Sequence, residues 1–342
     1  VPAFAGMTFG CGNDLWQWTR MTPRIRLIAG VALIVFGFAL LGWAIYAGLN
    51  PTAPFETRLA PISAEAAKDV EGLGLTPERL QQIEVSAKDE RRPIATGVVA
   101  RDDAGRLTPL TWRNQVTEPI FFADVSASDT AKVLSAIREH VPQDAVVLAW
   151  WDVSRAIRLV AGRAAPLDDA EARGLLLPAA WSVAGAAERA RWGAGVGATL
   201  AKSFTRFIDA LLDSDEARAS EALKKLADGK PAYVAVRISD AWMLAAARPQ
   251  QLSIAYKDFA ATGVSHGLIK SAQQWLRDQK IESGFAVEPM GGATRLHYFQ
   301  RKSDGDRLIA RLLPFSTSLP SPLTRFSLVY QHKGWWIWRL ND

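Results

Sequence analysis

The chain has 342 residues, of which 49% are apolar and 22% charged, so it can bury a core and is not a disordered tail. Its net charge of +5 comes from scattered Lys and Arg residues, a pattern that does not predict a nucleic-acid partner. The single cysteine, Cys11, excludes a disulfide framework, a multi-cysteine zinc site, an iron–sulfur cluster and a C-x-x-C-H haem attachment.

Residues 1–20 have no sustained periodicity and a composition unlike the rest of the chain. A far more regular segment begins at Met21. We therefore predict that residues 1–20 are a mis-assigned or disordered leader and that Met21 is the natural start, which would leave the protein without cysteine.

Residues 21–50 predict a transmembrane anchor. No charged residue lies between Leu27 and Phe55, and residues 25–49 are almost wholly apolar. A helix of that length crosses the ~30 Å hydrocarbon core of a bilayer. The alternative, a cleaved signal peptide, usually has an apolar stretch of about 7 to 15 residues and a small-residue cleavage site, which the Ile45–Ala47 segment lacks.

The flanks of this helix predict its orientation. Arg24 and Arg26 precede it, and Trp43 and Tyr46 near its far end are typical of interfacial anchors. By the positive-inside rule the N-terminus is cytoplasmic, and the rest of the chain lies in the periplasm of a bacterial cell.

Beyond the anchor we expect a stalk over residues 51–92, with Thr76-Pro77-Glu78 starting a helix, and a periplasmic α/β (mixed α+β) domain over residues 93–342. Within that domain, residues 166–228 predict a helical subdomain and residues 285–342 a β-rich end. Helices are expected at 128–140, 153–161 and 271–279. Strands are expected at 94–100, 107–112, 145–150, 233–238, 252–256, 285–288, 295–300, 307–313, 325–331 and 335–340.

The segment DAVVLAWWDVSRAIRLVAGR, residues 144–163, is the most distinctive stretch. A buried strand turns there into a helix, and ligands bind at such turns in open α/β sheets. Trp151 could form an aromatic wall, and Arg155 or Arg158 could neutralise Asp152. In the alternative interpretation Asp152 caps the helix and both indoles are core. The candidate ligand or partner residues are Trp150, Trp151, Asp152, Ser154 and Arg155.

The same stretch resembles the HaoB-type hydroxylamine oxidation proteins, as do the single N-terminal helix and a later segment, YVAVRISDAWML, expected as a strand. These are single-anchor accessory proteins associated with the hydroxylamine oxidoreductase of ammonia-oxidising and some methane-oxidising bacteria. The resemblance implies a non-catalytic role in nitrification without cofactors of its own. The partner would be a multihaem hydroxylamine oxidoreductase or a cytochrome that accepts its electrons.

A weaker similarity links Trp150-Trp151-Asp152 to the W-W-D-Y-G signature of oligosaccharyltransferase exported domains. Here Val153-Ser154 replaces Tyr-Gly, which puts acceptor recognition in doubt. The alternative function implied is a periplasmic glycan- or peptide-binding module or a glycosyltransferase-like domain. A scaffold with no small-molecule site is a third possibility.

Three further patterns carry weaker expectations. The Gly193–Ala198 segment fits G-x-G-x-x-A, but its flanks are helical in pattern, so a helix-to-helix turn is favoured over dinucleotide binding. The four histidines lack metal-ligand spacing, so no metal site is predicted. The C-terminal strand places tryptophans on both faces, and one face is expected to be core while the other, if exposed, would dock a partner. Its candidate residues are Trp335, Trp336 and Trp338.

Overall fold

The computed structural model describes residues 23–49, 53–88, 92–168, 173–193, 198–260, 266–290, 292–313 and 323–341. The chain divides into two compact units, Val1–Thr52 and Ala53–Asp342. The predicted leader, with Cys11, lies outside the described residues.

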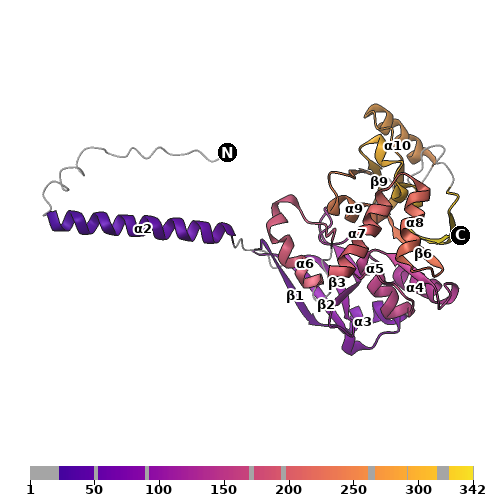
Figure 1. Cartoon of the computed structure of the whole chain (residues 1–342), viewed down its shortest axis with the longest axis horizontal. Helices are drawn as coiled ribbons and strands as arrows, with labels where there is room; N and C mark the ends of the chain where they lie inside the picture. Colours follow the sequence, from indigo (N-terminus) through magenta and orange to yellow (C-terminus); the bar gives the residue numbers. More distant parts are fainter. Residues whose placement is uncertain are drawn as a thin grey trace. The chain divides into compact units, whose positions relative to one another are not determined.

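Helix α2 (Pro23–Leu49) is the described element of the first unit and is uninterrupted in Figure 1. Its stretch Leu27–Tyr46 is the one described helix long and apolar enough to cross a membrane. The side chains of Leu27, Phe38 and Trp43 are about 70% exposed, because none of the described residues packs against them. An apolar helix exposed all round is typical of a segment that lies in lipid.

The second unit opens with an antiparallel sheet of four strands in chain order. These are β1 (Phe55–Pro61), β2 (Leu80–Ala87), β3 (Pro93–Arg101) and β4 (Leu107–Asn114). The strands expected at 94–100 and 107–112 are confirmed as the antiparallel hairpin β3–β4, whose turn uses Gly105 at φ +78°. Two short helices, α3 (Ala64–Val70) and η1 (Glu71–Leu73), connect β1 to the turn before β2.

The expectation of a stalk over residues 51–92 is wrong for the described part of that range. Strand β1 pairs with β2 along its whole length, from Phe55 opposite Ala87 to Pro61 opposite Gln81. Phe55, Ile83 and Val85 are buried in the main core, so the segment folds with the unit. Thr76 and Pro77 begin only the single 3-10 turn η2 (Pro77–Arg79), since β2 starts at the next residue.

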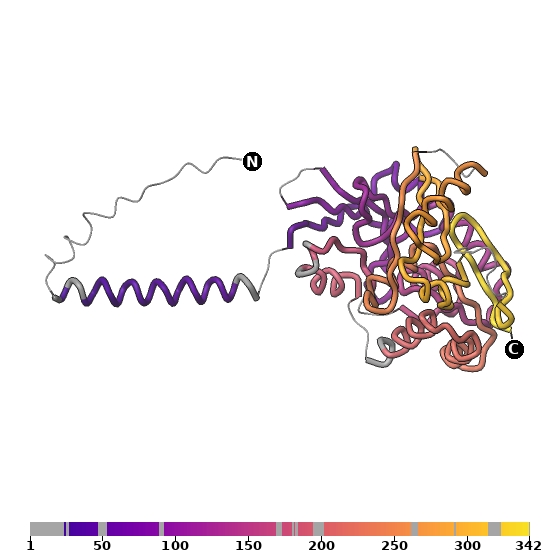
Figure 2. The backbone as a smooth tube through the Cα atoms, turned by 90° about the horizontal axis from the view of Figure 1, so that it is seen from above, coloured from indigo at the N-terminus to yellow at the C-terminus, as the bar shows by residue number. Residues whose placement is uncertain are grey.

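A second sheet of the unit is mixed, with its strands in the order β10-β11-β6-β5. Its strands are β5 (Val146–Ala149), β6 (Ala232–Arg237), β10 (Phe326–His332) and β11 (Trp335–Leu340). Strands β5 and β6 are parallel, so the chain must cross over between them. Figure 2 shows the C-terminal hairpin in yellow along the outside of this unit.

The helices confirm much of the expected order. Helix α4 (Ala127–His140) precedes β5, and α5 (Trp151–Ala156) with the π-turn η3 (Ile157–Ala161) follows it. The crossover to β6 is the predicted helical subdomain. It contains η4 (Ala179–Ala184), α6 (Gly185–Gly193), α7 (Ala198–Leu212) and α8 (Glu216–Leu226).

A third, antiparallel sheet in the order β7-β9-β8 follows α9 (Ile238–Ala247). Its strands are β7 (Ile254–Phe259), β8 (Phe285–Met290) and β9 (Ala293–Phe299). Helix α10 (His266–Asp278) connects β7 to β8. The segment YVAVRISDAWML is thus a strand only to Arg237, because the Asp240 carboxylate accepts the Arg237 backbone N–H at 2.9 Å and starts a helix.

Residues 307–313, expected as a strand, form the helix α11 (Leu308–Leu312) after the turn η5 (Lys302–Asp304). Leu308, Ile309 and Leu312 are buried, and Leu308 N–H bonds to the Asp213 carbonyl of the helical subdomain. A short apolar run does not distinguish strand from helix, and here tertiary packing selects the helix. The expected fold class, mixed α+β, is confirmed.

Candidate functional site

The tryptophan–aspartate segment lies where expected, at the carboxyl end of β5 and the first turn of α5. All five candidate side chains there are buried. Trp150 and Trp151 are both 0% exposed, so neither indole forms an aromatic wall on the surface. The Trp150 Nε1 atom has no hydrogen-bond partner among the described residues, whereas Trp151 Nε1 donates to the Arg173 carbonyl at 3.0 Å.

Asp152 pairs with an arginine that the sequence analysis did not select. Arg237, the last residue of β6, donates from Nη2 to both Asp152 carboxylate oxygens at 3.0 and 2.9 Å. Its Nε also donates to Asp240 of α9 at 3.0 Å, and its guanidinium lies 5.1 Å from the Trp335 ring. Because β5 and β6 are parallel neighbours, their carboxyl ends bring Asp152 and Arg237 together across 85 residues of sequence.

Two buried carboxylates share this one guanidinium, and the pKa of Asp240 is shifted. Burial raises the pKa of Asp240 to about 6, and the nearby Asp152 charge adds to the rise that Arg237 opposes. For Arg237, burial acts to lower the pKa, but the two carboxylates outweigh it and raise the pKa above its ordinary value. The arrangement holds charge inside the protein and exposes none of it.

Arg155 points to other partners than Asp152. It donates from Nη1 to the Leu107 carbonyl at 2.8 Å and to the Trp192 carbonyl at 2.5 Å, and its guanidinium lies 4.7 Å from the Trp151 ring centre. Burial, reinforced by the charge of Arg106, lowers the pKa of Arg155 to about 10. Arg155 thus joins the start of β4 to the end of α6.

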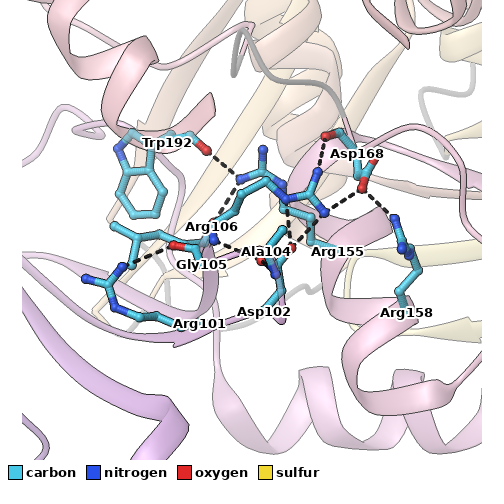
Figure 3. Close-up of polar contacts among 10 residues, drawn as sticks. Arg101, Asp102, Ala104, Gly105, Arg106, Arg155, Arg158, Asp168 and Trp192 are labelled. Carbon is cyan, nitrogen blue, oxygen red and sulfur yellow. Dashed lines mark hydrogen bonds and ion pairs between the residues drawn. The ribbon is translucent and has the colours of Figure 1, made fainter. Parts of the chain in front are cut away.

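An ion-pair network surrounds Arg155 at the turn of the β3–β4 hairpin (Figure 3). Arg106 contacts Asp102 and Asp168, each at 2.7 Å, and Arg158 contacts Asp168 at 2.5 Å. Burial acts to raise the pKa of Asp102, but hydrogen bonds and charge from Arg106 outweigh it and hold the pKa below its ordinary value. Arg158 therefore pairs with Asp168 and not with Asp152.

Ser154 completes the segment as a structural residue, because its Oγ donates to the Ala149 carbonyl at 3.0 Å. Asp152 does not cap α5: Trp150 is the N-cap residue and has no side-chain cap bond. The structure therefore agrees with core indoles but replaces the expected cap by a buried ion pair. An acceptor glycan would not reach these side chains in this conformation.

The tryptophans of β11 are also largely covered. Trp335 and Trp336, on opposite faces of the strand, are 7% and 6% exposed, while Trp338 is half-buried and donates from Nε1 to the Leu312 carbonyl at 2.9 Å. The condition for an aromatic docking face, exposure, is therefore not met at Trp335 and Trp336. Strand β11 is hydrogen-bonded to β10 at one edge and to β6 at the other.

The remaining expectations divide between the described and undescribed parts of the chain. The Gly193–Ala198 segment lies partly outside the described residues, but helices α6 and α7 flank it, so the strand that a dinucleotide motif needs is missing there. His297 lies between Trp242 Nε1 and Glu288, each at 3.0 Å, and His332 lies 2.8 Å from Asp129. In the described ranges no group of three or more His, Cys, Asp or Glu side chains could hold a metal ion.

Sequence reasoning missed Arg237, Asp240 and the Asp102–Arg106–Asp168 network. One local signal was available for the first two: Arg237 ends an apolar strand and Asp240 follows three residues later, a spacing typical of a helix start. Asp102 and Arg106 are only four residues apart, but Arg106 and Asp168 are 62 apart and Asp152 and Arg237 are 85 apart, so tertiary structure brings these last two pairs together.

The fold and the site together define a mixed α+β protein with an apolar helix of membrane-spanning length and internal, mutually paired charges. The chain belongs to the family described as HaoA-associated protein HaoB, whose model matches residues 22–340.

The comparison with curated proteins gives no match. Two solved structures are weakly similar over 62% of this chain. One is the C-terminal globular domain of an oligosaccharyltransferase from Archaeoglobus fulgidus, 13% identical with a TM-score of 0.33 over 97% of that chain. The other is the C-terminal domain of C. jejuni PglB, 10% identical with a TM-score of 0.36 over 99% of that chain.

Proposed function

We propose that this chain is a membrane-anchored accessory protein of hydroxylamine oxidation. Its second unit, on the periplasmic side, tethers or organises a multihaem HaoA-type hydroxylamine oxidoreductase or the cytochrome that accepts its electrons. The observation that carries the proposal is the family match over residues 22–340, which includes α2 as well as the folded unit. The haem groups of the partner carry the electrons, and α2 keeps the complex at the bilayer.

The geometry of the tryptophan–aspartate segment supports a non-catalytic role. A catalytic carboxylate must reach a substrate, whereas Asp152 is 3% exposed and both its oxygens accept hydrogen bonds from Arg237. Arg155, 2% exposed, donates to two backbone carbonyls. These groups stabilise the junction of the first sheet, the mixed sheet and the helical subdomain.

Affinity capture from membranes tests the proposal. The full chain, tagged at its C-terminus, is isolated from solubilised membranes of a hydroxylamine-oxidising bacterium, and the eluate is stained for haem after electrophoresis. We expect a multihaem protein to co-purify. The matched control carries residues 21–50 fused to an unrelated soluble domain, so it keeps the anchor and lacks the second unit. Absence of any haem protein, or equal capture by the control, contradicts the proposal.

A further inference from the structure

A basic hollow of about 280 Å³ in the second unit is not explained by the proposed function. Arg173, Lys202, Thr205 and Arg206 line it. On α7, Thr205 and Arg206 follow Lys202 by three and four residues, so both lie next to Lys202 on the surface of that helix. Three cationic side chains and a hydroxyl therefore surround one space, and none of the described residues lining it is acidic.

The first wall of the hollow is held by a buried indole. Trp151 Nε1 donates to the Arg173 carbonyl at 3.0 Å, and Arg173 Nη1 donates to Thr205 Oγ1 at 3.0 Å. The next residue, Gly174, has φ +77°, and a Cβ there would lie 2.7 Å from Trp150 and 2.3 Å from the Met243 carbonyl. The chain passes so close to the core at this point that the position of Arg173 is fixed.

The second wall, α7, is held by the neighbouring indole. Trp150 packs edge-to-face on Phe204, with ring centres 5.1 Å apart, and Phe204 is 0% exposed. Phe204 lies between Lys202 and Thr205 in the chain, so its burial turns the opposite face of α7 outward. The adjacent tryptophans thus hold the backbone of both walls in place.

We propose that this hollow binds the phosphate group of a phosphorylated ligand. A guanidinium fork matches two phosphate oxygens, a lysine ammonium adds a compact charge, and a threonine hydroxyl is a common additional contact. A phosphate carries up to two negative charges, so it is attracted to the exposed ammonium of Lys202 and guanidinium of Arg206. A soluble phosphorylated compound and an anionic lipid headgroup share this chemistry.

Calorimetric titration of the full chain with inorganic phosphate, in an uncharged detergent at fixed ionic strength, tests the proposal. We expect saturable binding at one site. The K202Q/R206Q double variant removes two exposed cations of the hollow and should weaken the affinity at least about tenfold. The control K225Q removes an exposed lysine of α8 outside the hollow and should leave the affinity unchanged. No saturable binding, or equal binding by the double variant, overturns the proposal.

Two further measurements test whether Trp151 positions the hollow and whether the bound phosphate belongs to a lipid or to a soluble compound. Trp151→Phe keeps a ring but removes the bond to the Arg173 carbonyl, so it should weaken phosphate binding with every charge of the hollow intact. If the W151F variant binds phosphate with wild-type affinity, the role assigned to the indole is contradicted. In nanodiscs, a weaker apparent phosphate affinity on adding phosphatidylglycerol identifies a lipid headgroup as the occupant, and an unchanged affinity identifies a soluble ligand.

Discussion

Arg237 is the residue that pairs with two buried carboxylates of the second unit, Asp152 and Asp240. It is the only guanidinium that the described contacts place on both Asp152 and Asp240, and all three side chains are nearly inaccessible to water. Burying charge costs free energy that close pairing must offset. Removing one partner therefore costs more than the pair itself contributes.

We expect Asp152→Ala to lower the free energy of unfolding by about 2–4 kcal/mol, because Arg237 would keep only Asp240 as a charged partner. Urea unfolding followed by circular dichroism measures the loss. The control is Asp103→Ala, whose carboxylate is 88% exposed and should matter by less than about 0.5 kcal/mol. Capture of the haem partner should survive the Asp152 change. A variant of wild-type stability that no longer captures the partner would assign Asp152 to an interface.

Asp240 predicts a pH dependence with a defined sign. Its pKa is raised from 3.8 to about 6 on folding, so between these values the folded protein holds a proton that the unfolded chain releases. The stability that Asp240 contributes is complete below about pH 4 and is lost as the pH rises to about 6.

Asp240→Asn does not titrate, so the stability difference between wild type and variant should fall by on the order of 2–3 kcal/mol from pH 4 to pH 7. Urea unfolding at a series of pH values measures it. Carboxylates with lowered pKa, such as Asp129 and Asp213, titrate in both proteins and cancel in the difference. A difference that is constant or that grows with pH contradicts the assignment.

At the scale of elements, one turn joins α7, α9 and the first turn of α5. Gly174 follows Arg173, and a Cβ at this position would meet Trp150 and the carbonyl of Met243. Nearby, Leu176 forms an isolated bridge with Phe121, so the turn is tied to the loop after β4 as well. Its conformation therefore positions several elements at once.

Gly174→Ala should destabilise the protein by about 2–4 kcal/mol, because the added Cβ is strained on a left-handed backbone and also clashes with a backbone carbonyl. Gly105→Ala is the matched control: its φ is +78°, and nothing lies within 4 Å of the added carbon. The control should cost only about 1 kcal/mol, the backbone part alone. Equal losses for the two variants in urea unfolding would show that the close approach at Gly174 has no energetic weight.

At the scale of the whole molecule, an apolar helix is joined to a folded unit that holds its own core. The orientation proposed here places Arg24 and Arg26 in the cytoplasm and the second unit outside. A reporter fused after Asp342 that is active only outside the cytoplasm should be active in intact cells. Expression of residues 53–342 alone should give a folded protein in the soluble cytoplasmic fraction. Activity of a C-terminal reporter that works only in the cytoplasm would place the second unit inside the cell, where it could not reach the proposed partner.

Patterns local in the chain were sufficient for much of the fold. The apolar run of α2, the strands of the β3–β4 hairpin and the helix α4 each depend on neighbours within one element or one hairpin, so periodicity and turn residues predict them. The strand predicted at 307–313 was wrong because its conformation depends on residues far away in the chain. Its apolar residues fit a strand or a helix, and contacts with the helical subdomain selected the helix.

By itself, the sequence determined the apolar helix, the mixed α+β class and the position of the tryptophan–aspartate segment at the end of a buried strand. Only the tertiary structure decided what that segment contacts. Asp152 meets Arg237 because β5 and β6 are parallel neighbours, and both indoles are core because the helical subdomain and the turn at Gly174 pack over them. Partners 85 residues apart leave no periodicity in the chain, since their distance is set by strand order and packing and not by local conformation.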